Sequence, residues 1–183
     1  MHFNIKDLFG GGKGQSKRPE FRDTLKAVPI FSELSRRELA SVERILHLRD
    51  YHEGELIFRQ DEPGLGMYII ETGRVAIRTD DSAGAMTELA DGEFFGELPL
   101  LDGGDRSATA VAITDTRIYG FFQPDLFALI ERDPRLGVKI VMGLAAVIGM
   151  RLRAANDRVE ELTRSASAAP AGPVAAAPRR RRR

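Results

Sequence analysis

Residues 92–109 read Gly-Glu-Phe-Phe-Gly-Glu-Leu-Pro-Leu-Leu-Asp-Gly-Gly-Asp-Arg-Ser-Ala-Thr, and this stretch decides the fold that we expect. Gly96 allows another group to approach the main chain closely, and the apolar turn after it presents free N–H groups at its start. An anion placed there gains hydrogen bonds and the positive end of the turn. Arg106 can pair with it through two N–H groups, and Ser107 adds a hydroxyl. The pattern is typical of a phosphate site.

Glu97 needs a separate explanation, because a carboxylate repels a phosphate. Its reasonable task is to accept hydrogen bonds from a sugar hydroxyl, so the stretch predicts a site for an anionic ribose ligand. The alternative is a vestigial site. In that case Arg106 and Glu97 form an ordinary ion pair that stabilises a loop, and the glycines only serve turns.

The chain around this stretch reads as short β runs separated by turn residues such as Gly54, Thr72-Gly73 and Asp91-Gly92. Closely spaced strands of this kind predict a compact antiparallel sandwich or barrel. The predicted strands are His47–His52, Glu55–Arg59, Met67–Glu71, Arg74–Thr79, Met86–Ala90, Thr109–Ile113 and Arg117–Phe122.

Helices are predicted before and after the strands in the sequence. Ser35 and Glu38 have the spacing of a capping box and open a helix over 35–46. Pro124 opens a second helix, Asp125 to Arg132, which Asp133-Pro134 breaks.

A long helix is then expected from Arg135 to about Thr163. Its second half carries apolar residues at alternating spacings of three and four, which predicts a coiled-coil seam and self-association as a homodimer. The seam residues are Ala145, Ile148, Leu152, Ala155, Val159 and Leu162.

These motifs together resemble the cyclic-nucleotide-binding domain family. Residues 94–101 and 106–109 are similar to its phosphate-binding cassette, Phe-Gly-Glu-(Leu/Ile)-x-Leu followed by Arg-(Ala/Ser/Thr)-Ala-Thr. Residues 28–34 resemble the start of the domain, and residues 60–64 and 67–75 resemble its β-roll signature. Residues 151–159 resemble the dimer helix of the catabolite activator branch.

The resemblance covers about residues 26–164 and implies a mainly β fold. This is an antiparallel, jelly-roll-like β-roll with an N-terminal helix and two C-terminal helices, the last one long. By analogy, Arg106 holds the cyclic phosphate and Glu97 the ribose 2′-hydroxyl. The cassette would be lined by Gly96, Leu98, Ser107 and Ala108, and the positions that face the purine would be Arg151, Ala155 and Asn156.

The sequence departs from the family pattern at five positions. Asp61 stands where glycine is usual, and Leu65 where an acid or amide is common. Pro99 replaces a small residue in the cassette turn, and Asp105 could compete for Arg106. Ala155 lacks the hydroxyl that purine-binding members of the activator branch often have. These departures bear on base selectivity more than on phosphate binding.

The two ends of the chain differ from its body in charge. We expect residues 1–25 to be a flexible basic segment and residues 165–183 a disordered Ala/Pro-rich tail that ends in five arginines. The net charge is zero overall but −9 over residues 23–163. The basic ends, and the poly-Arg tail above all, could therefore contact nucleic acid or an anionic surface.

Several classes of function are excluded or disfavoured. There is no cysteine, which excludes disulfides and thiolate metal sites. The glycine-rich residues 10–17 lack the Ser or Thr that follows the lysine of a P-loop. The three histidines show no ligand or catalytic spacing. We therefore predict no enzyme, no metal and no cofactor. Without a signal peptide or an apolar run long enough to span a bilayer, a cytoplasmic protein is expected.

The sequence thus predicts a regulatory module that binds cyclic AMP, in preference to cyclic GMP, and signals through its C-terminal helix to a protein partner. A winged helix-turn-helix after the dimer helix is not expected, which argues against a sequence-specific transcription factor. One alternative is a scaffold that retains the fold for dimerisation, with a vestigial pocket. Another gives the leading role to Arg179–Arg183 as a non-specific anchor.

Overall fold

The computed structural model describes residues 19–79 and 86–168. Contacts divide the chain into two compact units, residues 1–145 and residues 146–183, and each is described here by itself. The expectations for residues 1–18, for the glycine-rich segment within them, and for the poly-Arg tail lie outside the described residues.

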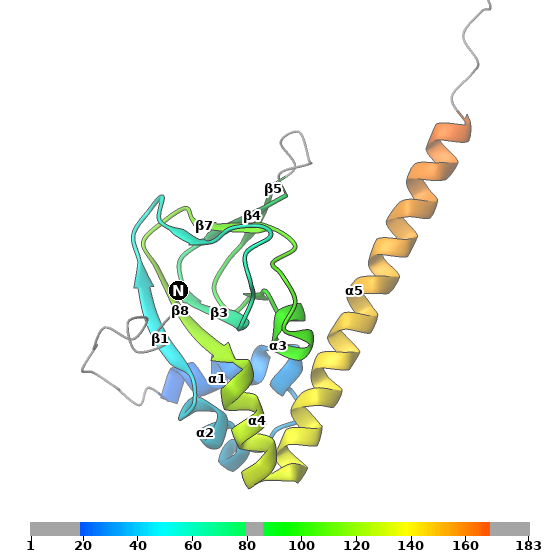
Figure 1. Cartoon of the computed structure of the whole chain (residues 1–183). Coiled ribbons are helices and arrows are strands. Elements are labelled where there is room, and N and C mark those ends of the chain that lie inside the picture. Colours follow the sequence, from blue (N-terminus) through cyan, green and yellow to red (C-terminus); the bar gives the residue numbers. More distant parts are fainter. Residues whose placement is uncertain (1–18, 80–85, 169–183) are drawn as a thin grey trace, which may run out of the picture. The chain divides into compact units, whose positions relative to one another are not determined.

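The first unit contains eight described strands in two four-stranded antiparallel sheets (Figure 1). One sheet has the order β1-β8-β3-β6 and the other β2-β7-β4-β5. The pairs β1–β8, β2–β7, β3–β6 and β4–β5 are nested, as in a long hairpin folded over on itself, which is the topology of a jelly roll. The strands are β1 His47–Tyr51, β2 Leu56–Phe58, β3 Gly66–Thr72, β4 Val75–Arg78, β5 Met86–Leu89, β6 Phe94–Phe95, β7 Thr109–Ala112 and β8 Thr116–Phe122.

The predicted fold class is confirmed, and the seven predicted strands correspond to seven of these eight. The missed strand, β6, is only two residues long and leads directly into the cassette. It forms because Phe94 and Phe95 pair with β3 and are buried on its two faces. A run of two residues carries no readable period, so sequence pattern alone could not identify it.

The interior of the β-roll is an apolar cluster drawn from both sheets. Alternate residues of each strand point inward, as expected for strands with one face against a core. The cluster consists of Tyr51, Phe58, Ile70, Val75, Phe95, Ala110, Ala112 and Ile118.

The N-terminal elements cover the outer face of the first sheet. Helix α1 (Pro19–Ala27) stacks Phe21 on Tyr119 of β8, and the 3-10 turn η2 (Pro29–Phe31) sets Phe31 against Phe121. The expectation that residues 1–25 are flexible is therefore wrong for residues 19–25. The reason is that Phe21 and Leu25 lie one helical turn apart and are both buried.

Helix α2 (Arg36–Glu43) begins as predicted. The Ser35 hydroxyl accepts a hydrogen bond from the Glu38 N–H, and the Glu38 carboxylate accepts one from the Ser35 N–H. This reciprocal capping box satisfies two N–H groups that the first helical turn leaves without partners.

Each C-terminal helix has a proline among its first two residues, where a missing N–H costs no helical hydrogen bond. Helix α4 (Gln123–Arg132) ends at Asp133, and α5 (Pro134–Ala168) follows at once. In the first unit α5 packs closely through two glycines. A Cβ on Gly137 would lie 2.5 Å from Ile130 of α4, and a Cβ on Gly143 would lie 2.3 Å from the Ile30 carbonyl oxygen.

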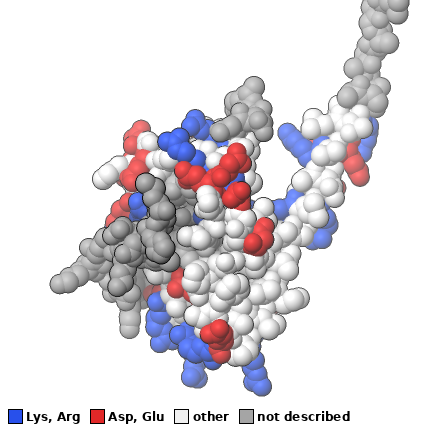
Figure 2. Space-filling model, in the orientation of Figure 1, with Lys and Arg blue, Asp and Glu red and all other residues white. Residues whose placement is uncertain are grey.

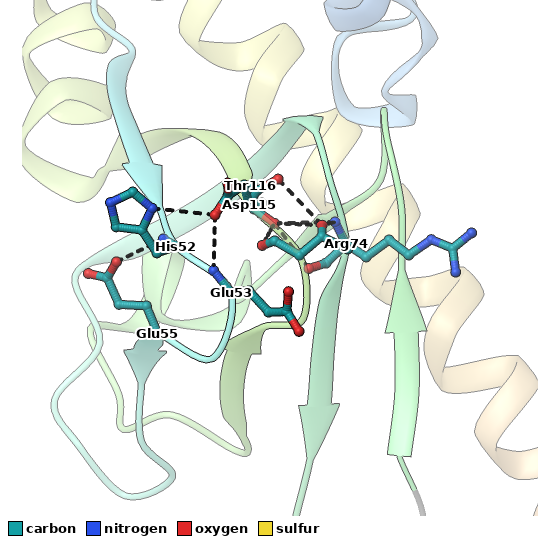
Figure 3. A network of polar contacts seen from close by, with 7 residues as sticks. His52, Glu53, Glu55, Arg74, Asp115 and Thr116 are labelled. Carbon is teal, nitrogen blue, oxygen red and sulfur yellow. Dashed lines mark hydrogen bonds and ion pairs between the residues drawn. The ribbon is translucent and has the colours of Figure 1, made fainter.

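A polar network joins turns at one edge of the β-roll (Figure 3). The Asp115 carboxylate accepts hydrogen bonds from the Glu53 N–H and contacts the His52 ring. On the next turn, the Arg74 N–H donates to the hydroxyls of Thr114 and Thr116. These contacts satisfy main-chain groups where strands end.

The second unit contains the rest of α5. The helix continues to Ala168, which is five residues beyond its predicted end at about Thr163. Within its last turns, the Ser165 hydroxyl donates to the Glu161 carbonyl of the preceding turn. None of the helices in the described residues is both long and apolar enough to span a membrane.

We predict that Glu38 makes folding stability sensitive to acid. Its carboxylate accepts a hydrogen bond from Lys139 of α5 at 2.7 Å and caps α2 at Ser35, and these contacts lower its pKa from 4.5 to about 2. A lowered pKa stabilises the fold above pH 4.5, and this contribution is lost as the pH falls toward 2. Glu38→Gln should flatten the dependence of the unfolding midpoint on pH across this window.

The matched control is Glu33→Gln, which removes an exposed carboxylate just before the same helix. In urea unfolding between pH 2 and 4.5, the midpoint of this control should change with pH as steeply as that of the wild type. Equal slopes for wild type and Glu38→Gln would contradict the prediction.

Candidate functional site

The candidate site lies where the chain crosses between the two sheets twice. Residues 59–65 connect β2 of one sheet to β3 of the other, and residues 96–108 connect β6 back to β7. The second crossover contains the short helix α3 (Leu98–Asp102), visible beside the β-roll in Figure 1. The two crossovers run antiparallel to each other, with a β-bridge between Pro63 and Asp105.

Main-chain hydrogen bonds hold Arg106 against the first crossover. The Arg106 N–H donates to the Glu62 carbonyl, and the Asp61 N–H donates to the Arg106 carbonyl, both at 2.9 Å. The Gly64 N–H donates to the Gly104 carbonyl at 3.1 Å. The direction in which the Arg106 side chain leaves the main chain is therefore set by a turn more than 40 residues away in sequence.

Asp61 explains one departure from the family pattern. Its φ is +63°, in the left-handed region that glycine adopts without strain. Aspartate tolerates this conformation better than most residues. Asp61 can thus replace the usual glycine and still leave the turn that pairs with Arg106 intact.

The Arg106 guanidinium is buried inside the β-roll, with 4% of the residue exposed. Its Nη1 donates to the Gly66 carbonyl at 2.6 Å and to the Gly96 carbonyl at 3.1 Å. Within the described residues, no carboxylate forms an ion pair with it. The Arg106–Glu97 ion pair of the vestigial alternative is therefore not formed.

Aromatic rings form the floor beneath this cation. The Arg106 Cζ lies 4.2 Å from the centre of the Phe58 ring and 5.4 Å from that of Tyr68. Both rings also pack against Phe95. Burial lowers the pKa of Arg106 and raises the pKa of Tyr68, so this is a dry environment in which charge interactions are strong.

Gly96 leaves room for the guanidinium, and Gly66 lets β3 lie close to the main chain of β8. A Cβ on Gly96, whose φ is +70°, would lie 2.6 Å from Arg106 Nη1. A Cβ on Gly66 would lie 2.2 Å from the Phe121 carbonyl oxygen. The sequence predicted close approach at Gly96 by a ligand, and in the structure the group that approaches it is Arg106.

Helix α3 is seated by Pro99. A Cβ on Gly64 would lie 2.4 Å from both Cβ and Cγ of Pro99, so the proline packs directly on the first crossover. As one of the first two residues of α3, it loses no helical hydrogen bond. Gly103 ends the helix in the left-handed conformation.

The remaining predicted residues differ in exposure. Glu97 is 4% exposed and precedes α3 directly, whereas Leu98 and Ser107 are exposed and Ala108 is half-buried. The structure thus brings the predicted cassette residues Gly96, Glu97, Leu98, Arg106, Ser107 and Ala108 into one crossover. Arg151, Ala155 and Asn156 lie on α5 in the second unit, which is described by itself.

Sequence reasoning missed the residues that support Arg106. Phe58 and Tyr68 read only as inward residues of strands, and the Gly66 carbonyl belongs to the main chain and leaves no trace in the sequence. The signal that could have suggested them is the presence of large aromatic residues at inward positions of a roll whose binding group is a cation.

A family model described as "Cyclic nucleotide-binding domain" matches residues 48–133. The "Cyclic AMP receptor protein" of Thermus thermophilus is 35% identical over 142 residues, which are 76% of this chain and 64% of that protein. The chain thus spans just under two thirds of this curated relative.

Two solved structures are also similar to this chain. The Thermus thermophilus catabolite activator protein is 36% identical, with a TM-score of 0.65 over 74% of this chain and 63% of that one. A structure from work on a cyclic-GMP-dependent signalling pathway in bacterial phytopathogenesis is 30% identical, with a TM-score of 0.54 over 63% of this chain and 95% of that one. The chain belongs to the cyclic-nucleotide-binding domain family, in its catabolite activator-like branch.

We predict that Gly96→Ala costs more than backbone strain. The substitution imposes a left-handed φ on alanine. It also places a Cβ against Arg106 Nη1, so the guanidinium must leave its carbonyl partners. The matched control is Gly54→Ala, where φ is +80° and nothing lies within 4 Å of the new Cβ. Both variants should lose about 1–2 kcal/mol from the left-handed conformation.

Gly96→Ala should lose at least about 1 kcal/mol more, the usual cost of a displaced buried hydrogen bond. Chemical denaturation of the three proteins without ligand measures the difference. Equal losses for the two variants would show that Arg106 does not depend on Gly96.

Proposed function

We propose that this chain binds a cyclic purine nucleotide at the crossover that contains Gly96, Glu97 and Arg106. The observation that carries the proposal is a buried guanidinium whose hydrogen bonds end on main-chain carbonyls and which forms no ion pair with a carboxylate in the described residues. Buried arginines are normally paired, because an isolated charge in a dry interior is costly. An anionic ligand that reaches Arg106 supplies the missing countercharge.

The other cassette residues fit the two halves of such a ligand. The cyclic phosphate would pair with Arg106 and accept further hydrogen bonds from Ser107, whose side chain is exposed and accessible. Glu97, buried beside Gly96, would accept a hydrogen bond from the ribose 2′-hydroxyl. Leu98 and Ala108 supply apolar contacts on either side.

We propose cyclic AMP as the preferred ligand and cyclic GMP as the alternative. The support for cyclic AMP is the similarity to a protein named as a cyclic AMP receptor. The structure linked to a cyclic-GMP-dependent pathway is less identical to this chain, at 30% against 36% for the Thermus structure. Arg151, Ala155 and Asn156 of α5 would face the base.

Helix α5 would transmit the effect of nucleotide binding from the domain to other proteins. In the second unit its seam is exposed in the single chain, with Leu152 60%, Val159 62% and Leu162 61% accessible. Apolar residues at coiled-coil spacing are normally covered by another helix. We propose that a second copy of α5 covers them, and that the resulting homodimer passes the signal to a protein partner. The function is regulatory and not enzymatic.

The first test is nucleotide binding by the wild type and by Arg106→Ala. Calorimetric titration with cyclic AMP and cyclic GMP should give a Kd of about micromolar or tighter, equivalent to roughly 8 kcal/mol. Arg106→Ala should weaken binding by about 2–4 kcal/mol, because the phosphate then stays buried without its partner. Arg106→Lys should recover only part of this, since an ammonium cannot pair bidentately.

The control for this test is stability without ligand. Arg106→Lys keeps a cation over Phe58, so it separates loss of binding from loss of folding if the alanine variant is unstable. Absence of a thermal shift in the wild type at millimolar concentrations of either nucleotide would overturn the proposal and favour the scaffold.

The second test concerns assembly. Replacing Leu152 and Val159 with Asp places like charges in the seam of a dimer and should cost several kcal/mol of association free energy, producing monomers. Sedimentation equilibrium at tens of micromolar compares wild type, this double variant and Ala154→Asp, which adds one carboxylate outside the seam and should stay dimeric. Nucleotide affinity should also fall in the monomeric double variant, because the same helix is expected to face the purine. A monomeric wild type would contradict the proposed route of signalling.

A further inference from the structure

A row of directly opposed residues crosses the inner face of the sheet β1-β8-β3-β6. Residues paired in this way project from the same face of a sheet. Two members of the row also pack in the apolar interior of the β-roll, which shows that this face is the inner one. In order across the four strands, the row consists of His47, Gly120, Tyr68 and Phe95.

Gly120 leaves a space in this row, and the ring of Phe122 fills it. Phe122 lies two residues further along β8, so its side chain leaves the strand on the same face. A Cβ on Gly120 would lie 2.7 Å from Cζ of Phe122, which shows that the ring folds back over the glycine. The Phe122 ring centre lies 6.1 Å from that of Tyr68, nearly perpendicular at 88°, and 5.3 Å from that of His47. Phe122 therefore makes the row of side chains continuous.

Toward the binding site, the row reaches the guanidinium of Arg106 through Tyr68. The Tyr68 ring centre is 5.4 Å from Arg106 Cζ, and the ring stacks on Phe58 and Phe95 at 5.7 and 5.5 Å. Stacked and edge-to-face contacts of this kind favour particular ring positions. Phe122 thus restricts where the Tyr68 ring can lie, and through that ring it restricts where the guanidinium can lie.

Away from the binding site, the row reaches the start of α4. Phe122 directly precedes α4 and is its N-cap residue. His47 Nε2 lies 2.9 Å from Oδ2 of Asp125, which belongs to the first turn of α4. Both side chains of this pair are half-buried, and the contact ties the start of the helix to β1. A displacement of the start of α4 would therefore move the Phe122 ring directly.

We propose that Phe122 is a positioning residue through which the position of α4 sets the affinity of Arg106 for the nucleotide. The helix start places the Phe122 ring, the ring supports Tyr68, and Tyr68 supports the guanidinium. The inference rests on the proposed function and names a residue outside the cassette that controls the same site. Because coupling between two sites is reciprocal, a nucleotide bound at Arg106 would in turn stabilise the start of α4 in this position.

The first test removes the ring. Phe122→Leu keeps an apolar side chain but loses the edge contact with Tyr68. It should weaken cyclic AMP binding by about threefold to tenfold, the range that an aromatic contact contributes. The matched control is Phe127→Leu, the same substitution at an exposed position of α4, which should bind as the wild type does. Calorimetric titration of the full-length proteins measures both affinities.

A second variant displaces the same ring without removing it. In Gly120→Ala the new Cβ meets the far end of the Phe122 side chain, which can rotate away, and Gly120 is not among the glycines with positive φ. The affinity should again fall by about threefold to tenfold. Gly120→Ala combined with Phe122→Leu should lose no more than either variant alone, because both act on one contact. Losses that multiply would overturn the proposal.

The link to α4 is tested at Asp125. Asp125→Asn removes the ion pair with His47 and should weaken binding by about twofold to fivefold, the range of a partly exposed ion pair, but not in the Phe122→Leu background. Figure 2 shows basic side chains gathered around α2 and the turn from α4 to α5, so losing a carboxylate there by itself favours an anion. The control Glu131→Gln removes an exposed carboxylate from the same helix and should not weaken binding.

A spectroscopic measurement on the free protein separates positioning from a general loss of stability. The ring currents of Phe58 and Tyr68 shift the NMR signal of the Arg106 Nε–H group, which Arg106→Lys identifies by its absence. This signal should move in Phe122→Leu and in Gly120→Ala. It should stay in place in Phe127→Leu, because that ring is exposed.

The outcomes separate the two proposals. If neither cyclic AMP nor cyclic GMP binds the wild type, the proposed function itself fails. If cyclic AMP binds but Phe122→Leu and Phe127→Leu have equal affinities, the role of Phe122 is overturned while the proposed function stands. An Arg106 signal that does not move in Phe122→Leu also overturns it. Equal affinities of Asp125→Asn and Glu131→Gln overturn the dependence on α4.

Discussion

The binding end of this domain depends on how a single guanidinium is held. Arg106 is buried against the Phe58 ring and two main-chain carbonyls, Gly66 and Gly96, without a carboxylate partner in the described residues. Taking a cation out of water without a countercharge is unfavourable, so the surrounding structure must compensate. It does so with aligned carbonyl dipoles and aromatic faces, which stabilise the charge without neutralising it and leave it attractive to an anion.

This arrangement is possible because the β-roll brings two distant crossovers together. The nested pairing of strands places residues 59–65 and residues 96–108 at the same end, where their main chains bond to each other. The contact between them is close, because Pro99 of the second crossover packs directly on Gly64 of the first. Binding chemistry is therefore supplied by one loop, and the position of that chemistry by another.

The sequence by itself determined the antiparallel β fold and the capping box at Ser35, because strand periods and caps are local properties of the chain. It did not reveal strand β6, helix α1 or the residues that support Arg106. Only the tertiary structure decided that the guanidinium lies on Phe58, pairs with the Gly66 carbonyl and forms no ion pair with Glu97. The contacts with the Gly66 carbonyl and the Phe58 ring join residues 40 and 48 positions apart, and such pairings follow from how the sheets pack, which no local pattern encodes.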